Sequence, residues 1–214
     1  MLPRIVAYLE AKQLSQFEFS NLRTFDSHWE KDNQHGNFWV YDSDIELDDL
    51  NLETEEYPDD VLGIIIKGNL TVGNIFNFET DYGMHLTVLG NLSATNIAVG
   101  GQDIHVTGNL IVRKLFMGSY NHGTIVVNGN VNCPIIIIDD YSFCTMGQVT
   151  GTVYGSEAVY FINGSEQTMI HHAEEEALKE IFVDSVFGEY GIDFAAVSKK
   201  IADHQSFLRP GATF

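Results

Sequence analysis

KGNLTVGNI, residues 67–75, is one copy of a short repeat that recurs along the 214-residue chain. The other copies are LGNLSATNI from Leu89, TGNLIVRKL from Thr107, NGNVNCPII from Asn128 and, more loosely, TGTVYGSEA from Thr150. Spacings of 22, 18, 21 and 22 residues separate the repeat glycines, which are Gly68, Gly90, Gly108, Gly129 and Gly151. Repeats of about 20 residues are typical of solenoids, in which each repeat forms one coil.

Apolar residues stand at fixed offsets from each glycine. With few exceptions they occupy the positions two and four residues before it and two and four residues after it. A further column, seven residues after the glycine, consists of Ile75, Ile97, Leu115, Ile136 and Ala158. Because side chains alternate between the two faces of a strand, the columns predict three short walls per coil, with one change of parity between the second and third.

The glycine and the residue after it stand where one wall turns into the next. That second residue is Asn in four copies and Thr in the fifth. Gly and Asn are the residues that best tolerate the unusual backbone angles of a corner. We therefore expect a corner in each coil and a ladder of stacked side chains made by Asn69, Asn91, Asn109 and Asn130.

The pattern as a whole predicts a mainly β fold, a short single-stranded parallel β-helix of about five coils. The length of the coils favours a right-handed helix. Two competing solenoids are disfavoured, because neither the Leu-x-x-Leu-x-Leu pattern of leucine-rich repeats nor the six-residue period of left-handed hexapeptide helices occurs.

The Gly-Asn corners at Gly68-Asn69 and Gly90-Asn91 resemble those of the bactofilins, cytoskeletal proteins that polymerise through short β-helical cores. The resemblance covers about residues 62–160, and it implies the β-helix fold and, as a function, end-to-end assembly. The chain departs from the family at its ends, because bactofilins tend to have short disordered tails that leave the coil ends free. Capped ends argue against polymerisation, so we expect a monomer or a small homo-oligomer.

Composition divides the chain into three regions. Residues 1–60 contain fifteen of the thirty acidic residues, with Phe and Trp to cover the first coil, and are assigned to an acidic α/β capping region. Residues 61–170 are assigned to the β-helix, and residues 171–214 to a C-terminal cap of two helices. Their apolar faces consist of Leu178, Ile181, Phe182 and Val186 in the first helix and of Phe194, Val197 and Ile201 in the second, which Asp193 can cap.

Thirty acidic and eleven basic residues give a formal net charge of -19. Such a chain repels nucleic acid and anionic membrane surfaces and attracts a basic protein partner. Neither a signal peptide nor an apolar run of membrane-spanning length occurs, which predicts a soluble, cytoplasmic protein. The two cysteines, Cys133 and Cys144, lack the spacing of a zinc or redox site, and we expect no cofactor.

The acidity is concentrated in residues 42–60, which hold ten acidic residues, no basic ones and several interspersed apolar residues. One interpretation is a solvated linker or an edge strand. The other is a docking surface for a basic partner, since carboxylates steer the approach and apolar neighbours hold the complex. The candidate partner-binding residues in this run are Asp42, Asp44, Glu46, Asp48 and Asp49.

Two further stretches supply candidates for the same surface. GSYNHGT offers Tyr120 and His122, which a loop would present to a partner. IIIIDDYSFC places Asp139 and Asp140 after a buried strand, with Tyr141 beside them. The two acids belong either to a solvated turn or to the acid and base of a carbohydrate-active enzyme.

His85, His105 and His122 lie in three successive coils at odd offsets from the glycines, so all three can face outward on one wall. A metal site is one interpretation, because imidazoles on stacked rungs are good ligands. The other, which we favour, is an exposed set without metal, because the unequal offsets stagger the three rings.

The leading hypothesis is a non-enzymatic protein-interaction module. Its most concrete version is an immunity-type inhibitor that neutralises a basic toxin in a bacterial cytoplasm. The alternative is a bactofilin-like structural protein that assembles end to end. A second alternative is a carbohydrate-active or metal-dependent enzyme, although no P-loop, nucleophile elbow or His-Glu-x-x-His motif occurs.

Overall fold

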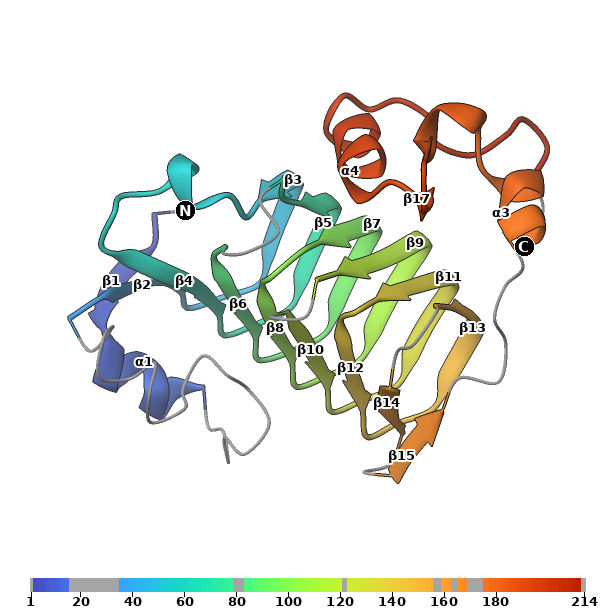
Figure 1. Ribbon diagram of the computed structural model, residues 1–214. Helices are drawn as coiled ribbons and strands as arrows, with labels where there is room; N and C mark the ends of the chain where they lie inside the picture. Colours follow the sequence, from blue (N-terminus) through green and yellow to red (C-terminus); the bar gives the residue numbers. More distant parts are fainter. Residues whose placement is uncertain are drawn as a thin grey trace.

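The computed structural model describes residues 2–15, 35–78, 83–120, 123–155, 159–162, 165–168 and 175–212. These residues form a parallel β-solenoid of about 5 turns, with helices along its sides (Figure 1). Each turn contributes one strand to each of two sheets, which enclose the core. The predicted mainly β, parallel β-helical fold is therefore confirmed.

The first sheet, sheet A, has nine strands. In spatial order they are β1 (Arg4–Ala7), β2 (Asn37–Tyr41), β4 (Val61–Ile66), β6 (His85–Val88), β8 (Asp103–Val106), β10 (Thr124–Val127), β12 (Ser142–Thr145), β14 (Val159–Ile162) and β15 (Ser165–Thr168). Neighbouring strands pair in parallel, except that β1 with β2 and β14 with β15 are antiparallel. An antiparallel strand thus lies at each end of sheet A.

The second sheet, sheet B, has six strands, all in parallel pairs. In spatial order they are β3 (Ile45–Asn51), β5 (Leu70–Phe76), β7 (Leu92–Val99), β9 (Leu110–Ser119), β11 (Val131–Asp139) and β13 (Val149–Tyr154). Each strand of sheet B follows a strand of sheet A in the chain, directly after the corner.

The solenoid begins earlier than the sequence predicted. Strand β2 pairs with β4 and β3 pairs with β5, both in parallel, so residues 37–51 form a coil although residues 1–60 were assigned to a cap. At the corner of this coil Ser43 and Asp44 stand in place of Gly and Asn, which is why the repeat pattern did not reveal it. Part of the acidic run forms β3, an edge strand of the described part of sheet B, as one of the two interpretations predicted; the other, a docking surface, stays a prediction.

The fifth corner glycine is Gly147, and the choice of Gly151 from the sequence was wrong. Val149, two residues after Gly147, pairs with Val131, which lies two residues after Gly129. The last spacing is therefore 18 residues, not 22. Gly151 lies inside β13 and has a φ of 134°.

The corners require glycine because successive coils approach closely there. A Cβ atom at Gly90, Gly108, Gly129 or Gly147 would lie 2.4–2.7 Å from the carbonyl oxygen of the corner glycine one coil earlier. None of these four residues has a positive φ. The physical reason thus differs from the predicted one, since the absence of a side chain matters and not the freedom of the backbone angles.

The predicted asparagine ladder is confirmed. The Oδ1 atom of each asparagine accepts a hydrogen bond of 2.8–2.9 Å from the backbone N–H of the corner residue one coil later. The members of the ladder are Asn69, Asn91, Asn109 and Asn130, with Asp44 before them and Gln148 after them. Each rung satisfies a corner N–H that lies outside the strand pairing.

The core consists of the inward-facing residues of successive coils. In the repeats from Gly68 to Gly129 its columns follow the predicted offsets, except that Phe116 faces inward in the Gly108 repeat in place of Leu115. The columns of the last repeat are displaced with its corner, and Ala158 lies outside the described residues. Between the pair Ala94 and Val112 and the pair Asn96 and Leu115, strand β9 has one more residue than β7. The extra residue moves Leu115 to the outer face and brings Phe116 against Phe143, with ring centroids 5.4 Å apart.

Helix α1 (Tyr8–Leu14) packs against the outer face of sheet A, at the N-terminal end of the solenoid (Figure 1). The buried cluster that it forms there consists of Tyr8, Ala11, Phe38, Val40 and Ile65, with Val6 of β1. The connection from β3 to β4 contains a short 3-10 helix, η2 (Thr54–Glu56). The N-terminal region therefore covers part of one sheet as well as supplying the first coil.

The described part of the C-terminal region packs along the side of sheet B, where the sequence predicted a cap (Figure 1). Its elements are α3 (Glu175–Ile181), η3 (Asp184–Val186), β16 (Phe187–Gly188), β17 (Gly191–Ile192) and α4 (Phe194–Ala202). The sheet residues beneath them are Phe76, Ala98, Leu115, Met117, Ile135 and Ile137. Asp193 caps α4 as predicted, because its carboxylate accepts the backbone N–H groups of Ala195 and Ala196. The first predicted helix ends earlier than expected, since Val186 lies in η3.

Candidate functional site

The N-terminal end of the solenoid is a step between the two sheets. Sheet A extends one strand beyond the first coil, because β1 pairs with the far edge of β2 (Figure 1). Sheet B ends at β3, whose far edge pairs with no other described strand. We call this surface the N-terminal step and define it by Ile5, Trp39, Ile45, Glu46, Leu47 and Asp48.

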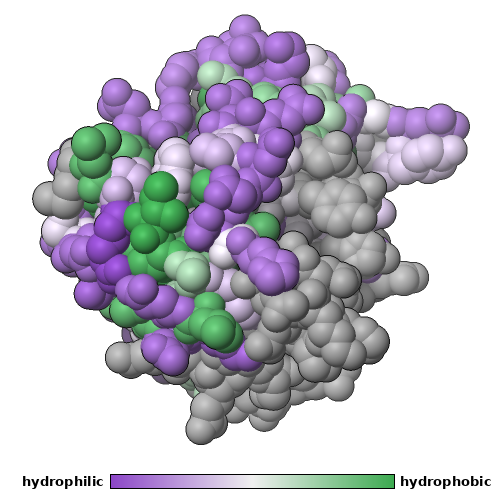
Figure 2. Space-filling model, turned by 90° about the vertical axis from the view of Figure 1, so that its left-hand side faces the viewer, coloured by the Kyte–Doolittle hydropathy of each residue, from purple (hydrophilic) through white to green (hydrophobic). Residues whose placement is uncertain are grey.

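Apolar side chains are exposed at the N-terminal step. The exposed fraction is 65% for Ile5 and 38% for Leu47. Ile5 pairs with Trp39, which packs against the end of the core, so the two side chains lie on the same face of sheet A. Figure 2 shows hydrophobic surface at this end of the molecule with hydrophilic residues around it. The last rung of the core is thus only partly covered.

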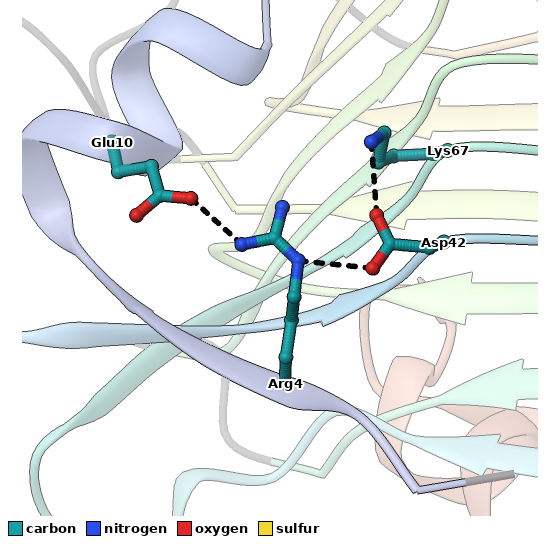
Figure 3. Close-up of polar contacts among 4 residues, drawn as sticks. All are labelled: Arg4, Glu10, Asp42 and Lys67. Carbon is teal, nitrogen blue, oxygen red and sulfur yellow. Dashed lines mark hydrogen bonds and ion pairs between the residues drawn. The ribbon is translucent and has the colours of Figure 1, made fainter.

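Asp42 ties β1 to the first coil (Figure 3). Its carboxylate lies 2.9 Å from both Arg4 Nε and Lys67 Nζ, and Arg4 Nη1 lies 2.7 Å from Glu10 Oε1. Lys67 and Arg4 lower the pKa of Asp42, while Glu10 and Asp42 raise the pKa of Arg4. Because two cations already compensate its charge, Asp42 offers little to a partner.

Asp44 belongs to the ladder. Its Oδ1 atom accepts the backbone N–H of Asn69 at 2.8 Å, and this bond, together with the one from the Asn69 side chain, lowers the pKa of Asp44. A carboxylate suits this first rung because it only accepts hydrogen bonds and no earlier described rung needs a donor. Its role is structural.

Asp49 joins the solenoid to the C-terminal region. Its Oδ1 atom accepts the side-chain N–H of Asn74 at 2.7 Å, and its Oδ2 atom lies 3.1 Å from Nε2 of His204. Asn74 in turn accepts a hydrogen bond of 2.8 Å from the side chain of Asn96. Asn74, Asn96, His204 and Asp48 line a cavity of about 610 Å³ between sheet B and the segment after α4.

Glu46 and Asp48 keep uncompensated charge at the N-terminal step. Both are exposed, and neither has an ion-pair partner among the residues that the structure describes. Glu46 pairs with Thr71 of β5, which places it at the start of an exposed column of sheet B, and Asp48 follows the exposed Leu47. Of the five predicted acidic residues, these two form the charged rim of the step.

The other predicted partner-binding residues lie elsewhere. Tyr120 and Asp139 meet at the turns after β9 and β11, where the backbone N–H of Tyr120 donates to the carbonyl of Asp139 at 2.9 Å. Asp139 and Asp140 are exposed, and Asp140 has a φ of 51°. His122 lies outside the described residues. Because β9 is three strands from β3, about 14 Å at the usual strand spacing, the predicted residues do not form one surface.

Tyr141 does not act with the two neighbouring acids. Its side chain is buried, and its hydroxyl donates to the carbonyl of Gln102 at 2.9 Å. The side chain near Asp139 is instead Ser119, whose Oγ lies 3.4 Å from Oδ2. The candidate acid and base of a carbohydrate-active site thus remain the adjacent pair Asp139 and Asp140, without help from the Tyr141 hydroxyl.

His85 and His105 face outward from sheet A as predicted, but they are largely buried and not exposed. The exposed fraction is 14% for the His85 side chain and 3% for His105. Burial lowers the pKa of both to about 3, so at neutral pH the 3.9 Å contact of His85 with Asp103 is no ion pair. His105 pairs with Thr87, so the two rings are staggered. The described residues contain no group of three potential metal ligands, and His122 is not among them.

Sequence reasoning missed Ile5 and the contacts of Arg4, which shape the N-terminal step. The available signal was RIVA, residues 4–7, in which Val6 is buried and Ile5 is exposed as in a half-buried strand. Four residues are too few for that alternation to be recognised before the pairing with β2 is known.

No protein-family model matches the chain, and comparisons with curated proteins and with solved structures find no significant match. Among the described residues, no helix has the length and apolar character needed to cross a membrane.

Proposed function

We propose that the protein is a non-enzymatic interaction module that binds a basic partner protein at the N-terminal step. One observation carries the proposal: the exposed apolar side chain of Leu47 stands between the uncompensated carboxylates of Glu46 and Asp48 on β3, whose far edge pairs with no other described strand, and the exposed Ile5 of β1 lies at the same end of the solenoid. Apolar contact supplies affinity, and the carboxylates select the sign of the partner's charge.

The charge of the whole chain supports the same kind of partner. A net charge of -19 attracts a cationic protein and speeds its association, and salt weakens this attraction. The most concrete version is an immunity-type inhibitor in a bacterial cytoplasm, which covers part of a basic toxin. The acidic composition and the open end of the solenoid support this version.

The test is affinity purification with the full chain at low and high salt. We expect a basic protein that the native chain captures and that the double variant Glu46→Lys, Asp48→Lys loses. The double variant Glu180→Lys, Glu189→Lys is the matched control, because it reverses two exposed charges of the C-terminal region, outside the step, and should retain the partner. Capture that survives both the double variant and high salt would refute the proposal.

End-to-end assembly, the bactofilin-like alternative, is a second proposal, because β13 also has a free edge among the described strands. Two observations oppose it. Sheet A has an antiparallel strand at each end, β1 or β15, and copies with a charge of -19 repel one another. Light scattering across protein concentration distinguishes the two, since a constant monomer or small oligomer supports the interaction module and growth into filaments supports assembly.

A further inference from the structure

We infer that the partner binds by adding a β-strand of alternating apolar and basic residues to the free edge of β3. This inference rests on the proposed function, and it names the kind of segment that the N-terminal step accepts. Strand addition uses the backbone of an edge strand for affinity and the alternating side chains for specificity.

The backbone of β3 is half paired. Ile45 pairs with Leu70, and its N–H donates to the carbonyl of Asn69 at 2.9 Å. In a parallel pair alternate residues direct their backbone groups to opposite sides, so the N–H and C=O of Glu46 point away from β5. No described strand lies on that side. An edge of this kind is a template for another strand.

The outer side of β3 is partly occupied only at its C-terminal end among the described residues, where the hydroxyl of Tyr57 donates to the carbonyl of Asn51 at 2.6 Å and the Tyr57 ring packs against Trp39. Sheet A already continues one strand further, through β1, whereas sheet B stops at β3 (Figure 1). A strand added about 4.8 Å from β3 would therefore lie level with β1 and complete a rung that only sheet A now contains. It would cover the exposed side chains of Ile5 and Leu47.

The side chains of β3 define what the added strand must offer. Ile45 and Leu47 pair with Leu70 and Val72, which belong to the core, so they end two inward columns. Glu46, between them, ends an outward column. Same-face neighbours on adjacent strands interact directly, so apolar residues fit beside Ile45 and Leu47, and a Lys or Arg fits beside Glu46.

A second copy of the chain fits this edge poorly. The strand available at the other end of the solenoid is β13, Val149–Tyr154, which contains no basic residue and would place threonine beside Glu46. Self-association also brings together two chains of charge -19. The occupant that the charges favour is a basic segment of another protein.

The first experiment measures the binding of synthetic peptides to the full chain by fluorescence anisotropy. The probe is acetyl-Lys-Val-Lys-Val-Lys-Val-Lys-amide, and the control Lys-Lys-Lys-Lys-Val-Val-Val has the same composition without alternation. A third peptide carries N-methyl groups on all its backbone nitrogens, which removes its hydrogen-bond donors but keeps its charge. A fourth is methylated only at the valines, so its lysine N–H groups can still pair with β3 in an antiparallel arrangement, in which the lysine directly beside Glu46 exchanges both backbone hydrogen bonds with it.

We expect the alternating peptide and the valine-methylated peptide to bind, and the other two to bind at least about tenfold more weakly. Binding should fall with salt. On the protein, Glu46→Gln should weaken binding through charge alone, and Glu46→Pro should weaken it further because proline also removes the outward N–H. We expect both variants to fold, because proline is tolerated on an edge strand, and circular dichroism tests this.

The outcomes separate this inference from the proposed function. Equal binding of the fully methylated or block peptide, with salt dependence retained, would overturn strand addition and leave the acidic docking surface standing. Capture of a basic protein that is lost in the Glu46→Lys, Asp48→Lys variant, without binding of the alternating peptide, would also overturn strand addition and leave the acidic docking surface standing. Absence of both a captured basic protein and peptide binding would overturn both.

Discussion

Replacement of Asn91 by alanine removes a central rung of the asparagine ladder. The Oδ1 atom of Asn91 accepts the backbone N–H of Asn109 at 2.8 Å and the Asn109 side chain at 3.2 Å. The Asn91 side chain also donates to Oδ1 of Asn69 at 3.2 Å. Alanine removes these three hydrogen bonds, while the backbone N–H of residue 91 keeps its bond to Asn69.

The magnitude follows from the number and setting of these bonds. A hydrogen bond within a protein contributes about 0.5–1.5 kcal/mol net. The corner is exposed, so water replaces part of the loss, and the two longer bonds are weaker than the bond to the backbone of Asn109. We expect the free energy of unfolding to fall by about 1–2 kcal/mol, which lowers Tm by about 2–8 °C for a chain of this size.

Urea unfolding followed by circular dichroism measures this loss. Asn132→Ala is the control, because Asn132 is exposed in β11 and makes no side-chain hydrogen bond to a described residue, and it should cost less than about 0.5 kcal/mol. Asn91→Asp keeps the acceptor for Asn109 but loses the donor, so it should fall between the native chain and the alanine variant. Equal losses for Asn91→Ala and Asn132→Ala would refute the stabilising role of the ladder.

Three further predictions test the core, a helix cap and the buried histidines. Val106→Asp should cost several kcal/mol because it places a charge in the core, whereas Val126→Asp, on the outer face of sheet A, should cost much less; similar Tm values would show the face assignment to be wrong. Asp193→Ala should cost about 1 kcal/mol in urea unfolding, because two N–H groups of α4 lose their acceptor; an unchanged midpoint would contradict the cap. Stability should be highest above pH 6.5 and should fall toward pH 3, because the unfolded chain protonates His85 and His105 at their ordinary pKa of 6.5 and the native chain only at about 3. Glutamine at both positions should remove a slope of up to about 2.7 kcal/mol per pH unit from urea titrations in that range, and a slope that stays the same would exclude these residues as its source.

The repeat predicted the solenoid and most of its core because the relevant signals are local. Inward residues recur at fixed distances from the corner, and the stacked asparagines recur with them, so the comparison of successive repeats reveals the coil. The two errors in the core arose where the period changes. The extra residue in β9 moved Phe116 inward, and the shorter last coil made Gly147 the corner, and both depend on strand register.

The candidate site was predicted only in part, because its residues act through partners that are distant in the chain. Asp42, Asp44 and Asp49 look alike in the acidic run, yet Arg4, Asn69 and His204 engage them in different ways. For Glu46 and Asp48, in contrast, no ion-pair partner occurs among the described residues. Burial of His85 and His105 likewise depends on packing that a single strand does not reveal.

The amino-acid pattern alone establishes the coil, its corner, the ladder and the sign of the charge, since each is a periodic or additive property. Tertiary structure establishes the N-terminal step, because β1 must pair with β2 across some thirty residues before sheet A becomes longer than sheet B. It also places the described C-terminal helices along sheet B, and no other described strand pairs with the outer edge of β3. Pairing between distant segments has no period in the sequence, and it is this pairing that decides which edges of a solenoid stay open.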